Sequence, residues 1–199
     1  MSTPDDDNSS ISIVYADLPQ RQVEADAIEE WYHSCLLLIK NRPGISPGIT
    51  PDIIPDIIVV EQIHFLQGRG GIITPDIRQG IYDPGKLQNS DARLQTLITT
   101  DAEGISLLWN TAKEQAFYIG DLNLGFGLNY RDDPVALNCR TATISCIQAM
   151  GLNLDTSDVP SRAGLDARPI PVKQTLPNNF DRAGIDPFYS EDYPNGPDF

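Results

Sequence analysis

Histidine, cysteine and basic residues are scarce in this chain of 199 residues. There are two histidines, three cysteines, and 14 lysines and arginines against 28 acidic residues, which gives a formal net charge of −14. Such an acidic surface repels phosphate backbones and anionic lipids, so we expect neither nucleic acid nor a membrane surface as a partner. A basic protein partner is compatible with this charge.

Long apolar runs and an export signal are also missing. No stretch of 18 apolar residues is present, so we expect no membrane span. Residues 1–10 have neither the positive nor the apolar region of a signal peptide, and their acidic, polar composition is typical of a disordered leader. We therefore expect synthesis in the cytoplasm, with any secretion depending on a specialised machinery.

The cysteines exclude a disulfide scaffold and lack the spacing of zinc ligands. Cys139 and Cys146 are two turns apart on a predicted helix, about 10 Å by helical rise, which is too far for a disulfide. Three cysteines are an odd number, and no paired metal-ligand motif is present, so both a disulfide scaffold and a zinc site are poor interpretations. We expect Cys35 and Cys146 to be buried core residues, and we expect no metal or other cofactor.

The hydrophobic pattern of the first half predicts three strands and one short helix. Alternating residues over 11–15 and apolar runs over 31–39 and 57–65 are typical of strands. Residues 20–31 have apolar side chains at helical spacing, which predicts a short helix. The four prolines of residues 41–56 exclude regular structure, so we expect a long loop inserted in the domain.

The second half predicts two helices and an irregular tail. A capping box that starts at Thr100 opens the first helix, and the second begins near Cys139 and ends at Gly151. The apolar face of the first helix consists of Ile105, Leu108, Ala112, Ala116 and Ile119. From 153 to 199 the composition changes to proline, aspartate, arginine and asparagine, so we expect an irregular tail wrapped on an α+β domain spanning 11–152.

Cys139 is the candidate nucleophile. A helix N-terminus carries about half a positive charge, which favours thiolate over thiol in the first turn. A cysteine nucleophile also needs a base within hydrogen-bond reach and a third group that orients the base. Both histidines precede Cys139 in the chain, so the base would precede the nucleophile. The alternative is that Cys139 is a small buried hydrophobic residue without chemistry.

The two histidines, His33 and His64, lie on separate predicted strands. If those strands pair, one imidazole can face the thiol while a second polar group orients it. Alternation along the strand puts Gln62 beside His64 and Glu61 on the opposite face. We predict that His33 is the base, because it begins the most apolar strand, and that His64 is the orienting group, with Gln62 and Glu61 as alternatives.

This order of residues resembles the circularly permuted papain-like fold, the permuted branch of the NlpC/P60 superfamily that includes lecithin:retinol acyltransferase-like enzymes. An Asn-Cys pair opens the catalytic helix of that family, and Asn138-Cys139 is similar. The sequence Tyr32-His33-Ser34 resembles the base-bearing strand, and the segment from Leu108 to Tyr130 resembles the family's helix and tyrosine-containing loop. The resemblance covers roughly residues 30–152.

The resemblance implies a small antiparallel sheet packed against the cysteine-bearing helix, and a cysteine amidase or endopeptidase. His33 would take the thiol proton, the Cys139 thiolate would attack an amide carbonyl, and backbone N–H groups would stabilise the oxyanion. Asn138 and Tyr130 would belong to the binding site. The acidic, proline-rich character is similar to that of bacterial effectors of specialised (for example type VI) secretion systems, which implies peptidoglycan-like peptides as the substrate.

Two further hypotheses need no thiol chemistry. A non-catalytic effector of the same fold would bind a host target or another protein partner, such as an immunity or secretion component, through the proline-rich loop and the aromatic residues of the tail. An acidic immunity or adaptor protein would bury Cys139 away from both histidines.

Overall fold

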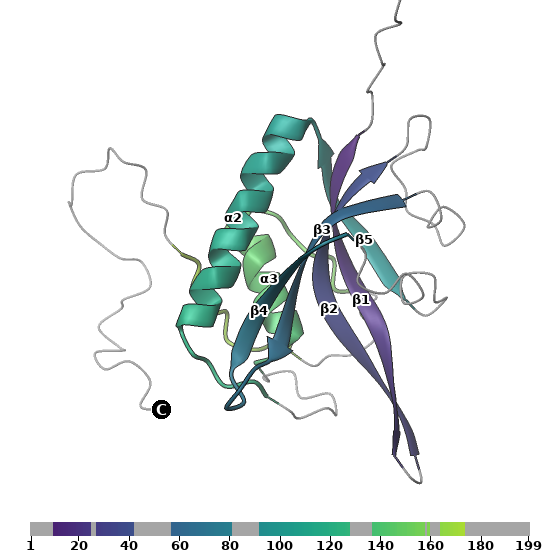
Figure 1. Cartoon of the computed structure of the whole chain (residues 1–199), viewed down its shortest axis with the longest axis vertical. Helices are drawn as coiled ribbons and strands as arrows, with labels where there is room; N and C mark the ends of the chain where they lie inside the picture. Colours follow the sequence, from purple (N-terminus) through teal and green to yellow (C-terminus); the bar gives the residue numbers. More distant parts are fainter. Residues whose placement is uncertain are drawn as a thin grey trace, which may run out of the picture.

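The computed structural model describes residues 10–24, 27–41, 57–80, 92–127, 137–157, 159 and 164–173. Within them the chain forms a five-stranded sheet and two helices, in the order β1 (Ile11–Glu24), β2 (Ala27–Asn41), β3 (Ile57–Gln67), β4 (Ile73–Gln79), β5 (Arg93–Thr100), α2 (Ala102–Asp121) and α3 (Cys139–Ala149). Figure 1 shows both helices on one side of the sheet, with α3 between α2 and the strands. The predicted α+β class and the antiparallel sheet are confirmed.

The strand order in the sheet is β4-β3-β2-β1-β5, and every neighbouring pair is antiparallel. The apolar run over 31–39 lies in the central strand β2, as predicted. The helix predicted over 20–31 is wrong, because these residues continue β1 and β2 as a paired hairpin from Gln20–Trp31 to Glu24–Ala27. Apolar spacing over so short a window is a weak signal, and cross-strand pairing overrides it.

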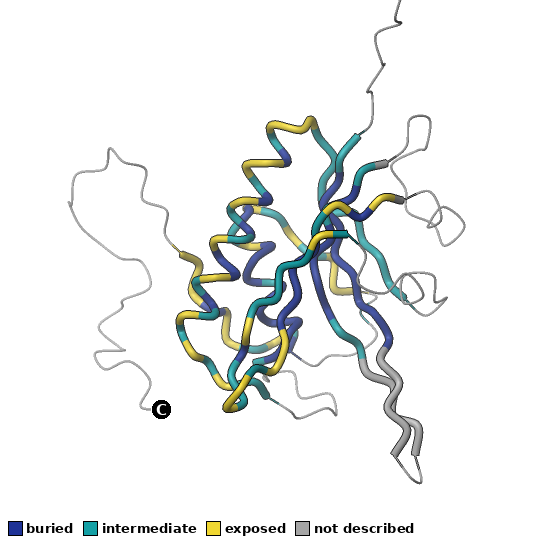
Figure 2. Tube along the Cα trace, in the orientation of Figure 1, coloured by how far each residue is buried: buried dark blue, intermediate teal, exposed yellow. Residues whose placement is uncertain are grey.

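Both faces of the sheet are buried, and each packs into its own cluster. The face toward the helices buries Ile13, Tyr15, Leu36, Ile63 and Phe65 with residues of α2 and α3. The opposite face buries Val14, Ala16, Leu18, Cys35, Leu37, Ile39 and Val59. Burial on both faces explains why the middle of β2 is a continuous apolar run rather than an alternating one. Figure 2 shows the central strands and α3 buried, whereas the outer side of α2 is exposed.

A β-bulge changes the register between β2 and β3. Leu38 pairs with Glu61 whereas Ile39 pairs with Val59, so Val60 is an extra residue on β3. Val59 is accordingly 5% exposed, against 38% for Val60 and 48% for Ile58. Simple alternation backward from His64 therefore holds as far as the bulge and fails beyond it.

The long helix α2 begins one residue later than predicted. Its N-cap is Asp101, whose side chain accepts a hydrogen bond from the N–H of Gly104. The predicted apolar face is largely the one that packs inward, with buried residues Ile105, Trp109, Ala112, Gln115, Ala116 and Ile119. Among the described residues, no helix combines the length and the apolarity needed to cross a membrane.

The short helix α3 begins at Cys139, as predicted, because Asn138 caps it. The C-cap is Met150, and Gly151 follows with a φ of 71°, a left-handed conformation that glycine adopts without strain. The described parts of the predicted tail, 153–157, 159 and 164–173, are irregular. The predicted leader and proline-rich loop, and the last part of the tail, lie almost entirely outside the described residues.

Three buried thiols make the fold less stable at alkaline pH. Burial raises the pKa of Cys35, Cys139 and Cys146 above the ordinary value for a thiol. The unfolded chain ionises its thiols above about pH 8.5 while the folded chain keeps them protonated, so stability is full below that pH and falls above it. We expect a loss of about 1.4 kcal/mol per pH unit for each thiol.

Urea unfolding at a series of pH values from about 7 to about 10 measures this slope. The Cys146→Ala variant should reduce the slope by about a third, because one of three buried thiols is removed. A free energy of unfolding that stays constant across the series would contradict the prediction.

Candidate active site

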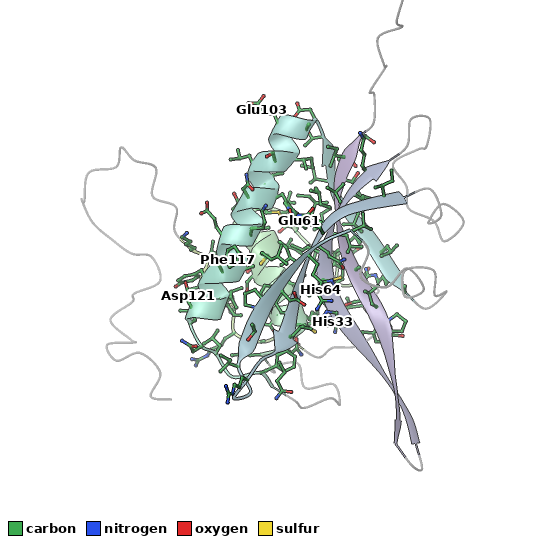
Figure 3. The ribbon with its side chains drawn as sticks, in the orientation of Figure 1. His33, Glu61, His64, Glu103, Phe117 and Asp121 are labelled. Carbon is green, nitrogen blue, oxygen red and sulfur yellow. The ribbon has the colours of Figure 1, made fainter. Side chains whose placement is uncertain are left out.

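His33 of β2 and His64 of β3 are hydrogen-bonded to each other. Nε2 of His33 lies 2.8 Å from Nδ1 of His64, and the two rings are nearly parallel, with centroids 5.0 Å apart. Cys35 is directly opposite His64 in the ladder, so the histidines are diagonal neighbours on one face of the sheet. Figure 3 shows them side by side. The pairing of the two strands thus brings both predicted histidines together.

Gln62 fixes the orientation of His64. Its Oε1 lies 2.5 Å from Nε2 of His64, and its Nε2 donates to the carbonyl of Gly80. Since a carbonyl only accepts, the amide nitrogen must face Gly80 and the amide oxygen must face His64. Neutral His64 therefore carries its proton on Nε2, and its Nδ1 is an acceptor.

The tautomer of His33 follows from the same hydrogen-bond network. Because Nδ1 of His64 accepts, Nε2 of His33 must donate to it, which leaves the basic lone pair of neutral His33 on Nδ1. Gln62, His64 and His33 thus form a hydrogen-bonded chain in which His33 donates from Nε2. Gln62 is therefore hydrogen-bonded to His64 and is not an alternative to it as the partner of His33.

Glu61 faces the other side of the sheet, as alternation predicts. Its carboxylate accepts a hydrogen bond from Nε1 of Trp109 and lies 3.3 Å from Nζ of Lys113. These contacts join β3 to α2. The carboxylate of Glu61 therefore interacts with α2, on the sheet face opposite His64.

Cys139 lies at the first turn of α3, against the backbone of β2. The ladder between β2 and β3 ends at the pair Cys35–His64, so Ser34 pairs with Asp17 of β1 but has no partner residue on β3. The backbone N–H of Ser34 interacts with the Cys139 thiol and favours its ionised form. Because Ser34 directly follows His33, the thiol meets β2 next to the predicted base.

Burial nevertheless dominates the ionisation of Cys139. The residue is 8% exposed, and its burial raises the pKa of the thiol. The Ser34 N–H and the guanidinium of Arg140 lower the pKa, whereas Asp17 raises it. The resting thiol is therefore protonated at neutral pH, and a nucleophilic role requires a base that removes the proton.

His33 and Cys139 approach β2 from different sides. The Ser34 hydroxyl faces α3 and accepts a hydrogen bond from Nε of Arg140, whereas the His33 side chain leaves the strand on the face that buries Cys35. The thiol and the imidazole thus meet at consecutive positions of β2 instead of on one face. Direct proton transfer requires one of the two side chains to turn at the open end of the β2–β3 ladder.

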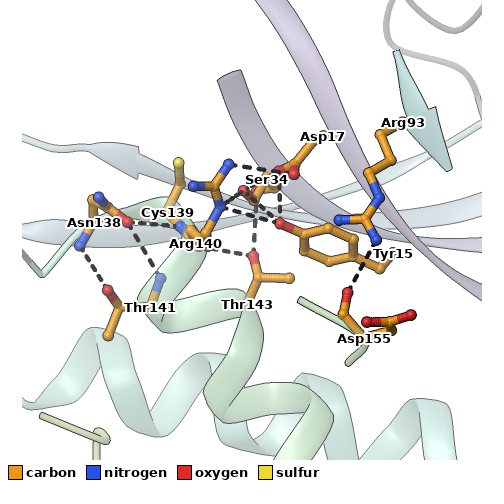
Figure 4. A network of polar contacts seen from close by, with 10 residues as sticks. All are labelled: Tyr15, Asp17, Ser34, Arg93, Asn138, Cys139, Arg140, Thr141, Thr143 and Asp155. Atoms are coloured by element: carbon orange, nitrogen blue, oxygen red, sulfur yellow. Dashed lines mark hydrogen bonds and ion pairs between the residues drawn. The ribbon is translucent and has the colours of Figure 1, made fainter. Parts of the chain in front are cut away.

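A buried polar network ties α3 to the sheet (Figure 4). Arg140 Nη2 lies 3.3 Å from Oδ2 of Asp17 in an ion pair without hydrogen-bond geometry. Arg140 Nε donates to the hydroxyls of Tyr15 and Ser34, at 3.3 Å each. Both hydroxyls in turn donate to Oδ1 of Asp17 at 2.6 Å. The side chains of Arg140 and Asp17 are almost completely buried, so this network sets the position of the first turn of α3.

None of these four residues is among the predicted site residues. One signal was present in the sequence, because Arg140 is the only charged residue in a helix of otherwise neutral residues. A charge in a helix that is apolar or small on all sides needs a buried partner. The sequence does not say which of the many acidic residues supplies it.

Asn138 serves as the N-cap of α3. Its Oδ1 accepts from the N–H groups of Arg140 and Thr141, at 2.9 and 3.3 Å, and Thr141 Oγ1 accepts from its N–H at 3.4 Å. Asn138 Oδ1 does not accept a hydrogen bond from the N–H of Cys139. This N–H is therefore the first-turn group that could donate to an oxyanion. Gly164 covers the cap so closely that a Cβ there would lie 2.5 Å from Asn138 Oδ1. Tyr130 lies outside the described residues.

No family model, curated protein or solved structure matches this chain. Within the part of the chain that the structure describes, no three histidine, cysteine or acidic side chains are grouped so as to hold a metal ion. The function must therefore be argued from the geometry of these residues.

The buried ion pair predicts a large effect on stability. Replacing Arg140 with Met leaves the carboxylate of Asp17 buried without its cation, which we expect to cost about 3–5 kcal/mol of unfolding free energy. Urea denaturation measures this change. The double variant Asp17→Leu/Arg140→Met should be more stable than Arg140→Met, because neither charge is then unpaired. As a control, Arg69→Met at an exposed site should change stability by less than about 0.5 kcal/mol.

Proposed function

We propose that the chain is a cysteine hydrolase of the permuted papain-like type, acting on amide bonds. One observation carries this proposal: the hydrogen-bonded chain Gln62–His64–His33 reaches the residue of β2 that directly precedes Ser34, whose backbone N–H interacts with the Cys139 thiol. Gln62 and His64 are almost completely buried, which is costly for polar groups, and apolar residues would stabilise the sheet equally well. The arrangement is therefore better explained by chemistry than by packing.

The proposed reaction is acyl transfer. Once one of the two side chains has turned at the end of the β2–β3 ladder, Nδ1 of His33 takes the thiol proton. The sulfur of Cys139 bonds to the amide carbonyl carbon, and the carbonyl electron pair moves onto oxygen. The N–H of Cys139 donates to this oxyanion. His33 then gives its proton to the departing amine. Water, deprotonated by His33, cleaves the thioester and releases the acid, and the proton returns to the thiol.

The substrate class follows from the resemblance and from the fold class. A five-stranded antiparallel sheet packed against the helix that bears Cys139 agrees with a permuted papain-like architecture. Peptide amides are the proposed substrates, and peptidoglycan peptides are the first class to test, with the chain acting as a secreted bacterial effector. This step depends on analogy between folds.

A non-catalytic acidic protein that binds another protein is the second candidate. It includes the inactive effector and the immunity or adaptor protein. The burial of Cys139 favours it, since burial raises the pKa of the thiol and β2 stands between the thiol and the His33 ring. The two candidates make opposite predictions for the reactivity of this thiol.

Replacing Cys139 with Ala tests catalysis directly. We expect the variant to lose hydrolysis by roughly a thousandfold or more, because the covalent intermediate cannot form. Release of free amines from purified peptidoglycan and from a peptide library measures the reaction. Cys146→Ala is the matched control, since it removes a buried thiol from the same helix and should retain activity. Equal activity of Cys139→Ala and the unmodified chain would contradict the proposal, and no amine release from either substrate would favour the binding protein.

The coupling of the thiol to His33 has its own test. If His33 deprotonates Cys139, the His33→Gln variant should be alkylated by iodoacetamide at Cys139 about tenfold more slowly near neutral pH. Mass spectrometry of the alkylated peptide separates Cys139 from Cys35 and Cys146, which are both completely buried. Equal alkylation rates with and without His33 would show that the two groups are not coupled.

A further inference from the structure

The outer face of α2 has exposed apolar residues that do not pack into the core. Leu107 is 71% exposed and Phe117 is 58% exposed, although the opposite side of the helix is buried in the core. The two residues are about 15 Å apart along the helix axis. Single exposed apolar residues are ordinary, so this pair alone does not define an interaction surface.

Acidic residues share the same face. At 3.6 residues per turn, Glu103, Leu107, Glu114, Phe117 and Asp121 fall within an arc of roughly 80°. Figure 3 shows Glu103, Phe117 and Asp121 along the outer side of the helix, away from His33 and His64. This set of five residues is called the α2 outer face below.

Asp121 is unfavourably placed for the helix itself. It lies in the last turn of α2, which contains no basic residue, so its carboxylate opposes the negative end of the helix dipole. Phe117 lies one turn before it on the same face. Residues that break a local stability rule are concentrated at functional surfaces, and here the rule is broken beside an exposed aromatic ring.

The two nearest described lysines already have acidic partners. Lys113 Nζ lies 3.3 Å from the carboxylate of Glu61, and Lys173 Nζ lies 3.4 Å from that of Glu114. Neither therefore offsets the charge of Glu103 or Asp121. The α2 outer face remains net acidic, with an apolar residue near each end.

We propose that the α2 outer face docks a basic amphipathic segment of a partner protein. Apolar side chains of the segment would pack on Leu107 and Phe117. A lysine or arginine would lie with its stem on the Phe117 ring and its charge beside Asp121, where the helix carbonyls also attract a cation.

Charge selects this occupant over the alternatives. A second copy of the chain carries a net charge of −14, and residues 174–199 have five acidic residues and one basic residue, so both would be repelled. An anionic membrane is disfavoured for the same reason. The surface lies on a different part of the fold from Cys139, so the proposal is independent of hydrolysis.

Binding of a synthetic peptide tests the proposal. The probe is a fluorescent, helical lysine–leucine peptide of about 14 residues, about four turns, and its glutamate–leucine counterpart is the negative control. Fluorescence anisotropy with the full chain should show binding of the lysine peptide alone. Phe117→Ser and Asp121→Asn should each weaken that binding about tenfold, and added salt should weaken it further.

Two matched variants separate specific docking from general attraction. Ile58→Ser removes an exposed apolar residue of β3, and Asp166→Asn removes an exposed acidic residue outside α2. Both should bind the peptide as the unmodified chain does. The proposal is overturned if the lysine peptide does not bind, or if each control weakens binding as much as its α2 counterpart. Amine release by the same variants should be unchanged, so a failure of docking leaves the proposed hydrolase intact.

Discussion

The buried ion pair between Arg140 and Asp17 is the contact on which the position of α3 depends. Tyr15 and Ser34 complete it with hydroxyl groups, so a cation of the helix and an anion of β1 are both neutralised inside the protein. Charges this deeply buried tolerate little displacement, because each is costly to leave without its partner. Since Arg140 directly follows Cys139, the same contact holds the thiol against the backbone of Ser34.

Local pattern predicts the elements of this fold whose signals are strong over their whole length. The apolar run of β2, the strand β3 and the start of α3 near Cys139 all belong to this class. β5 does not, since Arg93–Thr100 is an edge strand whose side chains are only partly buried, and the pattern did not predict it. The helix prediction over 20–31 also failed, because these residues form a hairpin whose structure depends on pairing between β1 and β2 and not on apolar spacing within the segment.

The same distinction applies to the candidate site. His33, His64 and Gln62 could be brought together by strand pairing and alternation, which both follow from the sequence. The sequence does not predict from which side of β2 the thiol approaches. That depends on how α3 packs against a strand 106 residues earlier, measured from Ser34 to Arg140. For the same reason the sequence does not identify Asp17 as the partner of Arg140.

The identity of the orienting groups determines what kind of dyad this site can form. A carboxylate behind His33 would stabilise the imidazolium and favour a resting ion pair with the thiolate. Here His33 is hydrogen-bonded to the imidazole of His64, which is hydrogen-bonded to the amide of Gln62. The carboxylate of Glu61 faces the helices, and that of Asp76, which is opposite His64 in the β3–β4 ladder, accepts a hydrogen bond from Arg78. Burial raises the pKa of the Cys139 thiol, so the thiol is protonated at rest. In the proposed reaction the thiol proton therefore moves only as the substrate carbonyl accepts negative charge beside the N–H of Cys139.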